Sequence, residues 1–271
     1  MTTGLTVPQT SLSTFVAFDD ANDQVIAFRE NTAGIGFGMN DLVTVKTPSA
    51  ESQFFTISRA GNQEVRPKLT GLLVFQARQG LLWPTSNDDK GKVKASPILI
   101  TRDMRTAVLN AGVAVERGED GKITAIQNAP PEMVETLSRL ERADRTWDWE
   151  SLPYTQFGSG KNGRGKFAKE SYHLFLLEEG AVVPIRFRSG SSAIKSIQNF
   201  LRQLPVVFYR AKIELTLQKK TSAGGEDYND VLIRMVEAVS PEEGEVVKAK
   251  MRNILAEEWN KGSIDSTEEA D

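Results

Sequence analysis

The chain has 271 residues, of which 39% are hydrophobic, enough to bury a substantial core in one elaborated domain or two small ones. It contains no cysteine, which excludes disulfides, a thiol nucleophile and thiolate metal sites. The formal net charge is −3, and no apolar run approaches the roughly 20 residues that a membrane-spanning helix needs.

The first half of the chain predicts short strands followed by helices. Apolar, β-branched segments separated by Asp, Asn and Gly predict strands at 14–18, 24–28, 42–47 and 53–58. A longer strand is expected at 68–84, with Gly71 as a bulge or bend inside it. The pattern then predicts a strand at 97–101 and helices at 102–110 and 131–145.

The second half predicts strands, a helix, a hairpin and a C-terminal helix. Strands are expected at 172–177, 182–187, 206–220 and 228–239, and helices at 190–204 and 241–259. In the strand at 206–220, alternation places Phe208, Arg210 and Lys212 on one polar face. These elements favour a β-rich α+β fold, a barrel or sandwich with added helices, in one domain over residues 1–260.

A glycine-rich stretch at 158–167, GSGKNGRGKF, has the Gly and Lys spacing of a nucleotide phosphate-binding loop. Such a loop needs Ser or Thr after the lysine to ligate Mg²⁺, and a buried strand before the glycines. Phe167 occupies the hydroxyl position and a half-polar segment precedes the loop, so we reject nucleotide hydrolysis. A basic loop over 154–169 remains, either a solvated turn or a contact for a phosphodiester backbone.

Charge and aromatic residues favour the second interpretation. Residues 151–220 contain 12 Lys and Arg against 4 Asp and Glu, a net charge of +8, whereas residues 221–271 contain 5 against 13, a net charge of −8. Interleaved cations and aromatic rings are what a non-specific single-strand binder needs. Each ring can alternatively be a core residue. Phosphate-binding candidates are Lys161, Arg164, Lys166, Arg186, Arg188, Arg210 and Lys212, and stacking candidates are Tyr154, Phe187 and Phe208.

Catalysis finds no support in the sequence. The only histidine, His173, falls in a predicted strand and is expected to be structural. No residue set has the spacing of a catalytic, cofactor or metal site, so we predict a protein that is not an enzyme. Residues 261–271 are expected to form a disordered acidic tail, which either solubilises the chain or competes with nucleic acid for the basic groove.

The loop QFGSG…GRGK, followed by a hydrophobic strand and the helix GSSAIKSIQNFL, resembles a family of phage and prophage proteins over roughly residues 35 to 243. We connect this family with single-stranded-DNA-binding proteins of the oligonucleotide-binding (OB) barrel type. Its members carry a cysteine-rich knuckle where this chain has Trp149, Leu152 and Ala168. The substitution predicts that apolar packing, in place of zinc, holds the loop.

The resemblance implies an OB-like barrel that binds single-stranded DNA without catalysis during phage or mobile-element replication or recombination. Replication and recombination proteins are candidate partners, and a homo-oligomer is an open alternative. The N-terminus lacks the pattern of a secretory signal, so the expected location is the cytoplasm of a bacterial host. The alternative function is a structural or protein-interaction component of a phage or mobile element.

Overall fold

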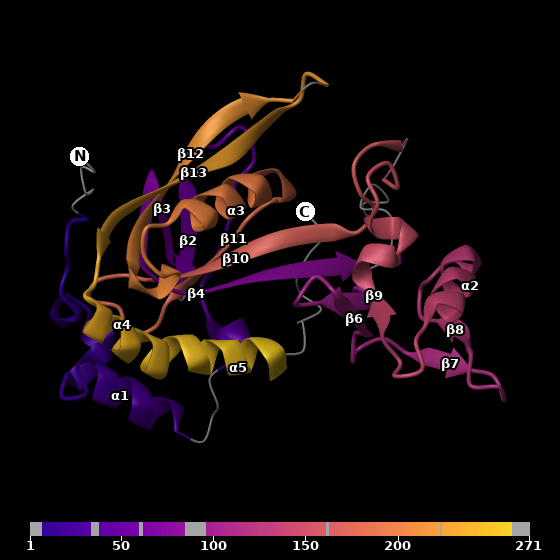
Figure 1. Ribbon diagram of the computed structural model, residues 1–271, viewed down its shortest axis with the longest axis horizontal. Coiled ribbons are helices and arrows are strands. Elements are labelled where there is room, and N and C mark those ends of the chain that lie inside the picture. The colour runs from indigo at the N-terminus through magenta and orange to yellow at the C-terminus, as the bar shows by residue number, and fades with distance from the viewer. Residues whose placement is uncertain are drawn as a thin grey trace, which may run out of the picture. The chain divides into compact units, whose positions relative to one another are not determined.

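The chain divides into two compact units that contain both helices and strands (Figure 1). This computed structural model describes residues 7–33, 38–59, 62–84, 96–160, 163–222 and 224–261. Unit 1 comprises Met1–Gln76 and Tyr172–Lys261, and unit 2 comprises Ala77–Ser171. The predicted strand-rich α+β class is confirmed. One domain over residues 1–260 stays a prediction, and the acidic tail from residue 262 onward lies outside the described residues.

Unit 1 is built on a strongly curled sheet with helices around it. Its strands are β1 (Thr44–Lys46), β2 (Phe55–Arg59), β3 (Asn62–Arg66), the first part of β4 (Lys68–Leu82), most of β10 (Lys169–Leu177), β11 (Ile185–Arg188), β12 (Ala211–Thr221) and β13 (Asp227–Ala238). Its helices are α1 (Asp23–Thr32), α3 (Ile194–Gln203), α4 (Pro241–Val247) and α5 (Asn253–Lys261), and a π-helical segment, Lys248–Arg252, joins the last two.

The strand order of the main sheet in unit 1 is β1-β11-β10-β4, and β12 pairs with both β4 and β13. β1 runs parallel to β11, whereas β10 with β11, β12 with β13 and β12 with β4 are antiparallel. β2 and β3 form a separate hairpin. Gly71 permits close approach of β10, because a Cβ atom there would lie 2.7 Å from the carbonyl oxygen of Leu177.

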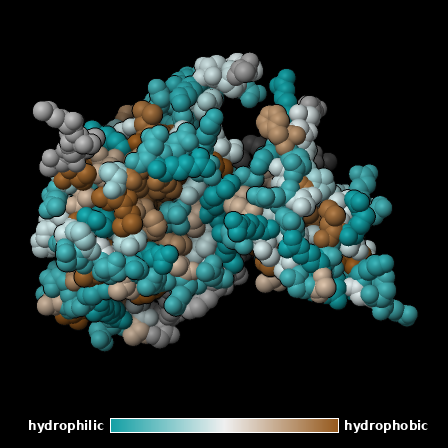
Figure 2. Space-filling model, in the orientation of Figure 1, coloured by the Kyte–Doolittle hydropathy of each residue, from teal (hydrophilic) through white to brown (hydrophobic). Residues whose placement is uncertain are grey.

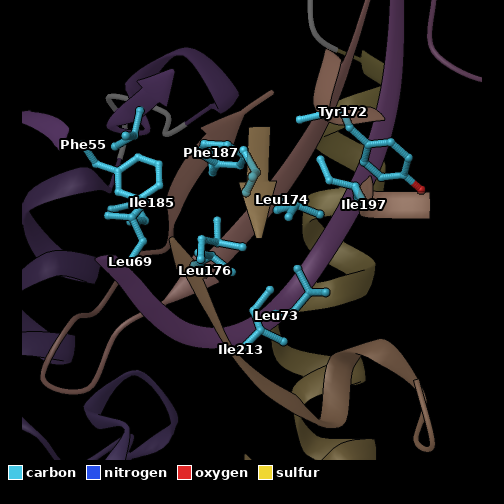
Figure 3. Packing of buried hydrophobic residues seen from close by; sticks show 14 of the residues in the cluster. Phe55, Leu69, Leu73, Tyr172, Leu174, Leu176, Ile185, Phe187, Ile197 and Ile213 are labelled. Atoms are coloured by element: carbon cyan, nitrogen blue, oxygen red, sulfur yellow. The ribbon is translucent and has the colours of Figure 1, made fainter. Parts of the chain in front are cut away.

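The core of unit 1 lies between the curled sheet, the β2–β3 hairpin and α3. In Figure 3, side chains from these elements point toward one another, with Phe55 and Phe187 among them. Their rings meet edge to face, with centroids 5.9 Å apart. Ile197 enters the same cluster from the apolar stripe of α3. The core therefore depends on segments that are far apart in the sequence.

The described part of unit 2 contains an antiparallel sheet, a small hairpin and one α-helix. The sheet continues from the end of β4 through β5 (Leu99–Thr101), β6 (Thr106–Leu109) and β9 (Trp147–Asp148). The hairpin joins β7 (Val115–Arg117) to β8 (Ile123–Ile126), and α2 (Pro131–Leu140) packs against β8. The indole Nε1 of Trp147 donates to the carbonyl oxygen of Leu137, 2.8 Å away, which ties β9 to α2.

Three predicted elements differ in the structure. The expected strand at 24–28 lies in α1, because Asn22 caps this helix by accepting the amide of Gln24 at 2.9 Å. The expected strand at 14–18 is replaced by short 3₁₀ turns. The expected helix at 102–110 is a turn and β6, because the carboxylate of Asp103 accepts the amides of Arg105 and Thr106 and starts a turn.

The predicted C-terminal helix is confirmed at its start. The hydroxyl of Ser240 accepts the amide of Glu243, and the carboxylate of Glu243 accepts the amide of Ser240, so both capping bonds form. Pro241 occupies the first helical position, where its missing N–H is not needed.

His173 is fully buried in β10, where its ring packs against Trp259 with centroids 4.8 Å apart. Burial, and after it the charges of Arg186 and Arg188, holds the pKa of His173 well below its ordinary value of 6.5. The predicted structural role fits this position.

We expect the free energy of unfolding to fall as the pH drops below 6.5. The unfolded chain takes up a proton on His173 near that pH and the folded chain does not, so unfolding becomes easier by up to about 1.4 kcal/mol per pH unit. Urea denaturation from about pH 7.5 to about pH 5.5 measures this slope, and the variant His173→Gln should lack it. An equal slope in the variant would contradict the prediction.

Candidate nucleic-acid interface

The glycine-rich loop lies in unit 2 between a 3₁₀ helix, η5 (Pro153–Thr155), and strand β10. The structure describes this loop except for residues 161 and 162, so the candidate Lys161 lies outside the described residues. A nucleotide-binding loop needs a strand before its glycines and a helix after them. Here a 3₁₀ helix precedes and a strand follows, which agrees with the rejection of that motif.

Backbone hydrogen bonds close the loop on itself. The amides of Gly158 and Gly160 donate to the carbonyl oxygen of Gly165 at 2.6 and 3.3 Å, and the amide of Gly163 donates to Gly160 at 3.1 Å. Gly158, Gly163 and Gly165 have φ angles of 94°, 71° and 61°, which glycine adopts without strain. The amides of Gly158, Gly160 and Gly163 therefore serve the loop itself and are not open to a phosphate.

Ser159 fixes the base of the loop. Its hydroxyl accepts the amide of Phe167 at 2.9 Å and lies 2.9 and 2.7 Å from the carbonyl oxygens of Tyr154 and Gln156, to which it can donate. The amide of Ala168 also donates to Tyr154, at 2.9 Å. The two ends of the loop are thus joined, so the residues between them project from a fixed base.

An apolar cluster supports the loop from below. Trp149, Leu152 and Ala168, which the sequence analysis expects to hold the loop by apolar packing, are 1%, 1% and 2% exposed and belong to one cluster. The prediction that these apolar side chains pack together beneath the loop is confirmed. Gly80 makes room for the indole, because a Cβ atom there would lie 2.4 Å from Cζ2 of Trp149.

The loop presents one exposed aromatic ring and several cations. Phe157 is 85% exposed. Arg164 and Lys169 are exposed and form no ion pair with any residue that the structure describes. Lys166 is also exposed, and its Nζ lies 2.8 Å from Oε1 of Glu170. Exposed cations around an open ring are what stacking and phosphate neutralisation require.

Of these residues, sequence reasoning selected Arg164 and Lys166 and passed over Phe157. The available signal was that Phe157 is the only aromatic residue in the run QFGSG, with no apolar neighbour to pack it. Tyr154, which was selected as a stacking face, is half-buried against the cluster beneath the loop, and its ring centroid lies 5.7 Å from that of Phe167. Its packing therefore limits it to a supporting role in this conformation.

The candidates on β11 are core or sheet residues, which corrects the predicted groove. Phe187 is 0% exposed, so its faces are not open to a base in the folded chain. Arg186 is buried, and its Nε donates to the hydroxyl of Thr44 at 2.9 Å. Arg188 is half-buried and lies opposite His173 in the sheet register. These candidates were chosen because cations and an aromatic ring are interleaved in the sequence. Successive side chains of β11 point to opposite faces of the sheet and are buried or half-buried, so both faces of this strand are interior.

The candidates at the start of β12 are also engaged within unit 1. Residues 208–210 form a 3₁₀ turn, so the expected common face of Phe208, Arg210 and Lys212 does not exist. Phe208 packs against the core and meets the ring of Tyr209 edge to face, with centroids 5.4 Å apart. Nζ of Lys212 lies 2.7 Å from Glu179 and also contacts β13.

Arg210 joins the start of β12 to the start of α4. Its Nε donates to the carbonyl oxygen of Val239 at 2.9 Å. Its aliphatic stem crosses the backbone of Gly244, where an added Cβ atom would lie 2.5 Å from Cγ of Arg210. The side chain is therefore a structural clamp.

Ion pairs between β12 and β13 compensate part of the charge asymmetry of the sequence. Nζ of Lys212 lies 3.0 Å from Glu237, Nζ of Lys219 lies 2.7 Å from Asp227, and Lys220 pairs with Asp230. The basic strand thus lies beside the acidic one, which pairs opposite charges across the hairpin. These cations are compensated within the hairpin, whereas Arg164 and Lys169 in the loop are not.

No protein-family model, no curated protein and no solved structure matches the chain. The resemblance to phage proteins therefore stays a prediction. Within the described ranges, no helix is both long and apolar enough to cross a membrane. In the same part of the chain, no three or more histidine and acidic side chains gather in a way that could hold a metal ion.

Proposed function

We propose that the loop over 154–169 binds single-stranded nucleic acid without catalysis. Phe157 stacks on a base, and Arg164, Lys166 and Lys169 neutralise the neighbouring phosphates. The observation that carries the proposal is the 85% exposure of Phe157. Its ring is left in water, and a base that stacks on it would supply the favourable free energy of burial that the fold does not. Following the resemblance, the strand is DNA in phage or mobile-element replication or recombination, inside a bacterial host.

The curled sheet of unit 1 supports the finer proposal of an OB-like barrel. A sheet that curls strongly is the architecture from which a partly open barrel is made. The proposed binding loop does not depend on this assignment, because every residue in it belongs to unit 2.

Existing contacts of the loop do not prevent binding. Lys166 must loosen its pair with Glu170 to reach a phosphate. The lysine side chain is 41% exposed, and Glu170 keeps Arg78 as a second partner at 3.4 Å. Stacking of one base contributes roughly 1–3 kcal/mol. Backbone hydrogen bonds and the hydroxyl of Ser159 already hold the described part of the loop together before binding.

A protein-interaction role is the second candidate, and the β2–β3 hairpin is the observation that favours it. Val65 lies opposite Thr56 in the register, and Phe54 precedes them on the same face. Phe54 and Val65 are 48% and 60% exposed. An uncharged face with two exposed apolar side chains fits a protein partner.

Replacing Phe157 by alanine should weaken binding of a labelled oligo-dT by about 5- to 150-fold, the equivalent of roughly 1–3 kcal/mol. Fluorescence anisotropy measures the affinity. The matched control is Phe54→Ala, which removes an exposed phenylalanine from unit 1 and should leave the affinity unchanged. Equal affinities for the wild-type chain and Phe157→Ala would rule out stacking at the loop, and absence of binding at low salt would favour the protein-interaction role.

The salt dependence separates loop cations from paired ones. On single strands, log K falls with log[salt] with a slope of about −0.7 for each neutralised phosphate. The double variant Arg164→Ala with Lys169→Ala should flatten this slope by up to about 1.4. The control Lys219→Ala with Lys220→Ala removes two cations that already have acidic partners, and it should leave the slope nearly unchanged.

A further inference from the structure

A second cationic site lies in unit 2, in a groove between the β7–β8 turn and the end of α2. The groove has a volume of about 800 Å³, and its cationic lining residues are Lys122, Arg139, Arg142 and Arg145. On the face visible in Figure 2, hydrophilic residues dominate around α2, β7 and β8, the elements that Figure 1 draws in magenta. The sequence analysis singled out none of these residues.

The floor of the groove is fixed by a network around Glu141. Both carboxylate oxygens of Glu141 accept from Arg117, at 2.6 and 2.8 Å, and Arg145 NH1 lies 3.5 Å from one of them. The carbonyl oxygen of Gly121 accepts from Arg117 at 2.9 Å and from Arg145 at 2.8 Å. The hydrogen bonds from Arg117 hold the pKa of Glu141 below its ordinary range, so this acid is charged and already matched by arginine.

Arg145 is placed over this floor by an unusual backbone. Its φ angle of 65° is in the left-handed region, which residues other than glycine rarely adopt. The turn is closed by hydrogen bonds from the amide of Arg145 to the carbonyl oxygen of Arg142, at 3.0 Å, and from the amide of Arg142 to Thr146, at 2.8 Å. Only NH1 of Arg145 bonds to a residue that the structure describes, which leaves Nε and NH2 for a ligand.

The remaining cations at the rim have weak or no internal partners. The side chain of Arg139 is exposed and forms no hydrogen bond or ion pair with any residue in the described part of the chain. Lys122 is 73% exposed at its side chain and lies 3.4 Å from Asp120, and Arg142 is 48% exposed beside Asp148 at 3.0 Å. Two lining acids, Asp120 and Glu135, face these cations besides Glu141, so the groove keeps an excess of positive charge.

We infer that this groove binds phosphate groups. Resting on the proposed function, these are the phosphates of the nucleic-acid strand whose base stacks on Phe157. Guanidinium groups match phosphate through paired N–H donors, and three arginines line one groove. The groove and the loop share one connecting segment. Arg142 pairs with Asp148, which caps the turn containing Glu150, and Gln156 of the loop donates to the carbonyl oxygen of Glu150 at 2.6 Å.

The test uses the full chain and two probes, a labelled oligo-dT followed by anisotropy and inorganic tripolyphosphate followed by calorimetry. The variant is Arg139→Glu, whose exposed and unpaired side chain can be changed without disturbing the fold, and the thermal midpoint checks this. The matched control is Arg202→Glu, which makes the same charge change on an exposed arginine of α3 in unit 1. Phe157→Ala is measured beside them.

Arg139→Glu should bind oligo-dT about eightfold more weakly than the control at 0.05 M salt, and its salt slope should be smaller by about 0.7. The eightfold figure is the gain in affinity that one neutralised phosphate gives at 0.05 M salt compared with 1 M salt. It should also weaken tripolyphosphate binding. If Phe157→Ala weakens oligo-dT binding while Arg139→Glu behaves like Arg202→Glu, the groove proposal is wrong and the proposed function stands.

The converse result separates the two proposals in the other direction. Suppose that the wild-type chain does not bind oligo-dT but binds tripolyphosphate, and that Arg139→Glu abolishes this binding whereas Arg202→Glu does not. The groove is then an inorganic-phosphate site, and the proposed function is wrong. If the wild-type chain binds neither probe, the groove proposal is overturned as well.

Discussion

Replacing Trp149 by alanine is expected to lower the free energy of unfolding by about 3–5 kcal/mol. The indole is 1% exposed in the cluster beneath the glycine-rich loop, and it fills the space that Gly80 leaves open. Removing it leaves a cavity bordered by Leu152 and other apolar side chains, which close-packed surroundings fill only in part.

Calorimetry and hydrogen exchange measure this loss at two levels. Calorimetry gives the change in stability, and exchange at Gly158, whose amide donates to Gly165, reports whether the loop loosens. Trp149→Phe keeps part of the volume and should cost less. A chelator should leave the stability of both proteins unchanged, because the side chains that pack beneath the loop are apolar and offer no metal ligand. A loss below about 1 kcal/mol for Trp149→Ala would show that the cluster does not support the loop.

Phe187→Ala is expected to destabilise the chain by a similar amount, about 3–5 kcal/mol. The ring is 0% exposed and packs edge to face against Phe55 in the core of unit 1 (Figure 3). Its removal deletes both the buried area and the contact between rings. Urea denaturation measures the effect.

Phe157→Ala is the matched control for this substitution, since it removes the same side chain from an exposed position. It should leave the free energy of unfolding within about 0.5 kcal/mol of the wild-type value. The two phenylalanines are thus expected to separate stability from binding. A Phe187→Ala chain with unchanged stability and weakened oligo-dT binding would restore Phe187 as a stacking face.

Elements with a strong internal signal could be predicted from the sequence. The apolar stripe of α3 and the capping residues Ser240 and Glu243 mark helices whose structure agrees with the pattern. The segment at 24–28 was misread because a short apolar run is compatible with either a strand or a helix. In α1 only Val25 is buried. A helix that buries a single side chain does not need the apolar stripe by which a helix is recognised in a sequence.

The candidate site was harder to predict than the fold, because it depends on which side chains remain uncompensated. Lys219 and Arg164 look alike in the sequence, but β13 places Asp227 beside the first. Phe187 and Phe157 likewise differ only in what covers them. Charge pairing across a hairpin and burial by distant segments depend on the tertiary structure. Residue type and local spacing in the sequence do not reveal them.

The contact between Arg210 and Gly244 makes these two positions dependent on each other during sequence change. Any side chain larger than hydrogen at 244 meets the stem of Arg210, and a shorter residue at 210 loses the bond to Val239. Relatives of this chain should therefore vary at both positions together or at neither. A pair of substitutions that is tolerated jointly, and not singly, would be the mark of this clamp in an alignment.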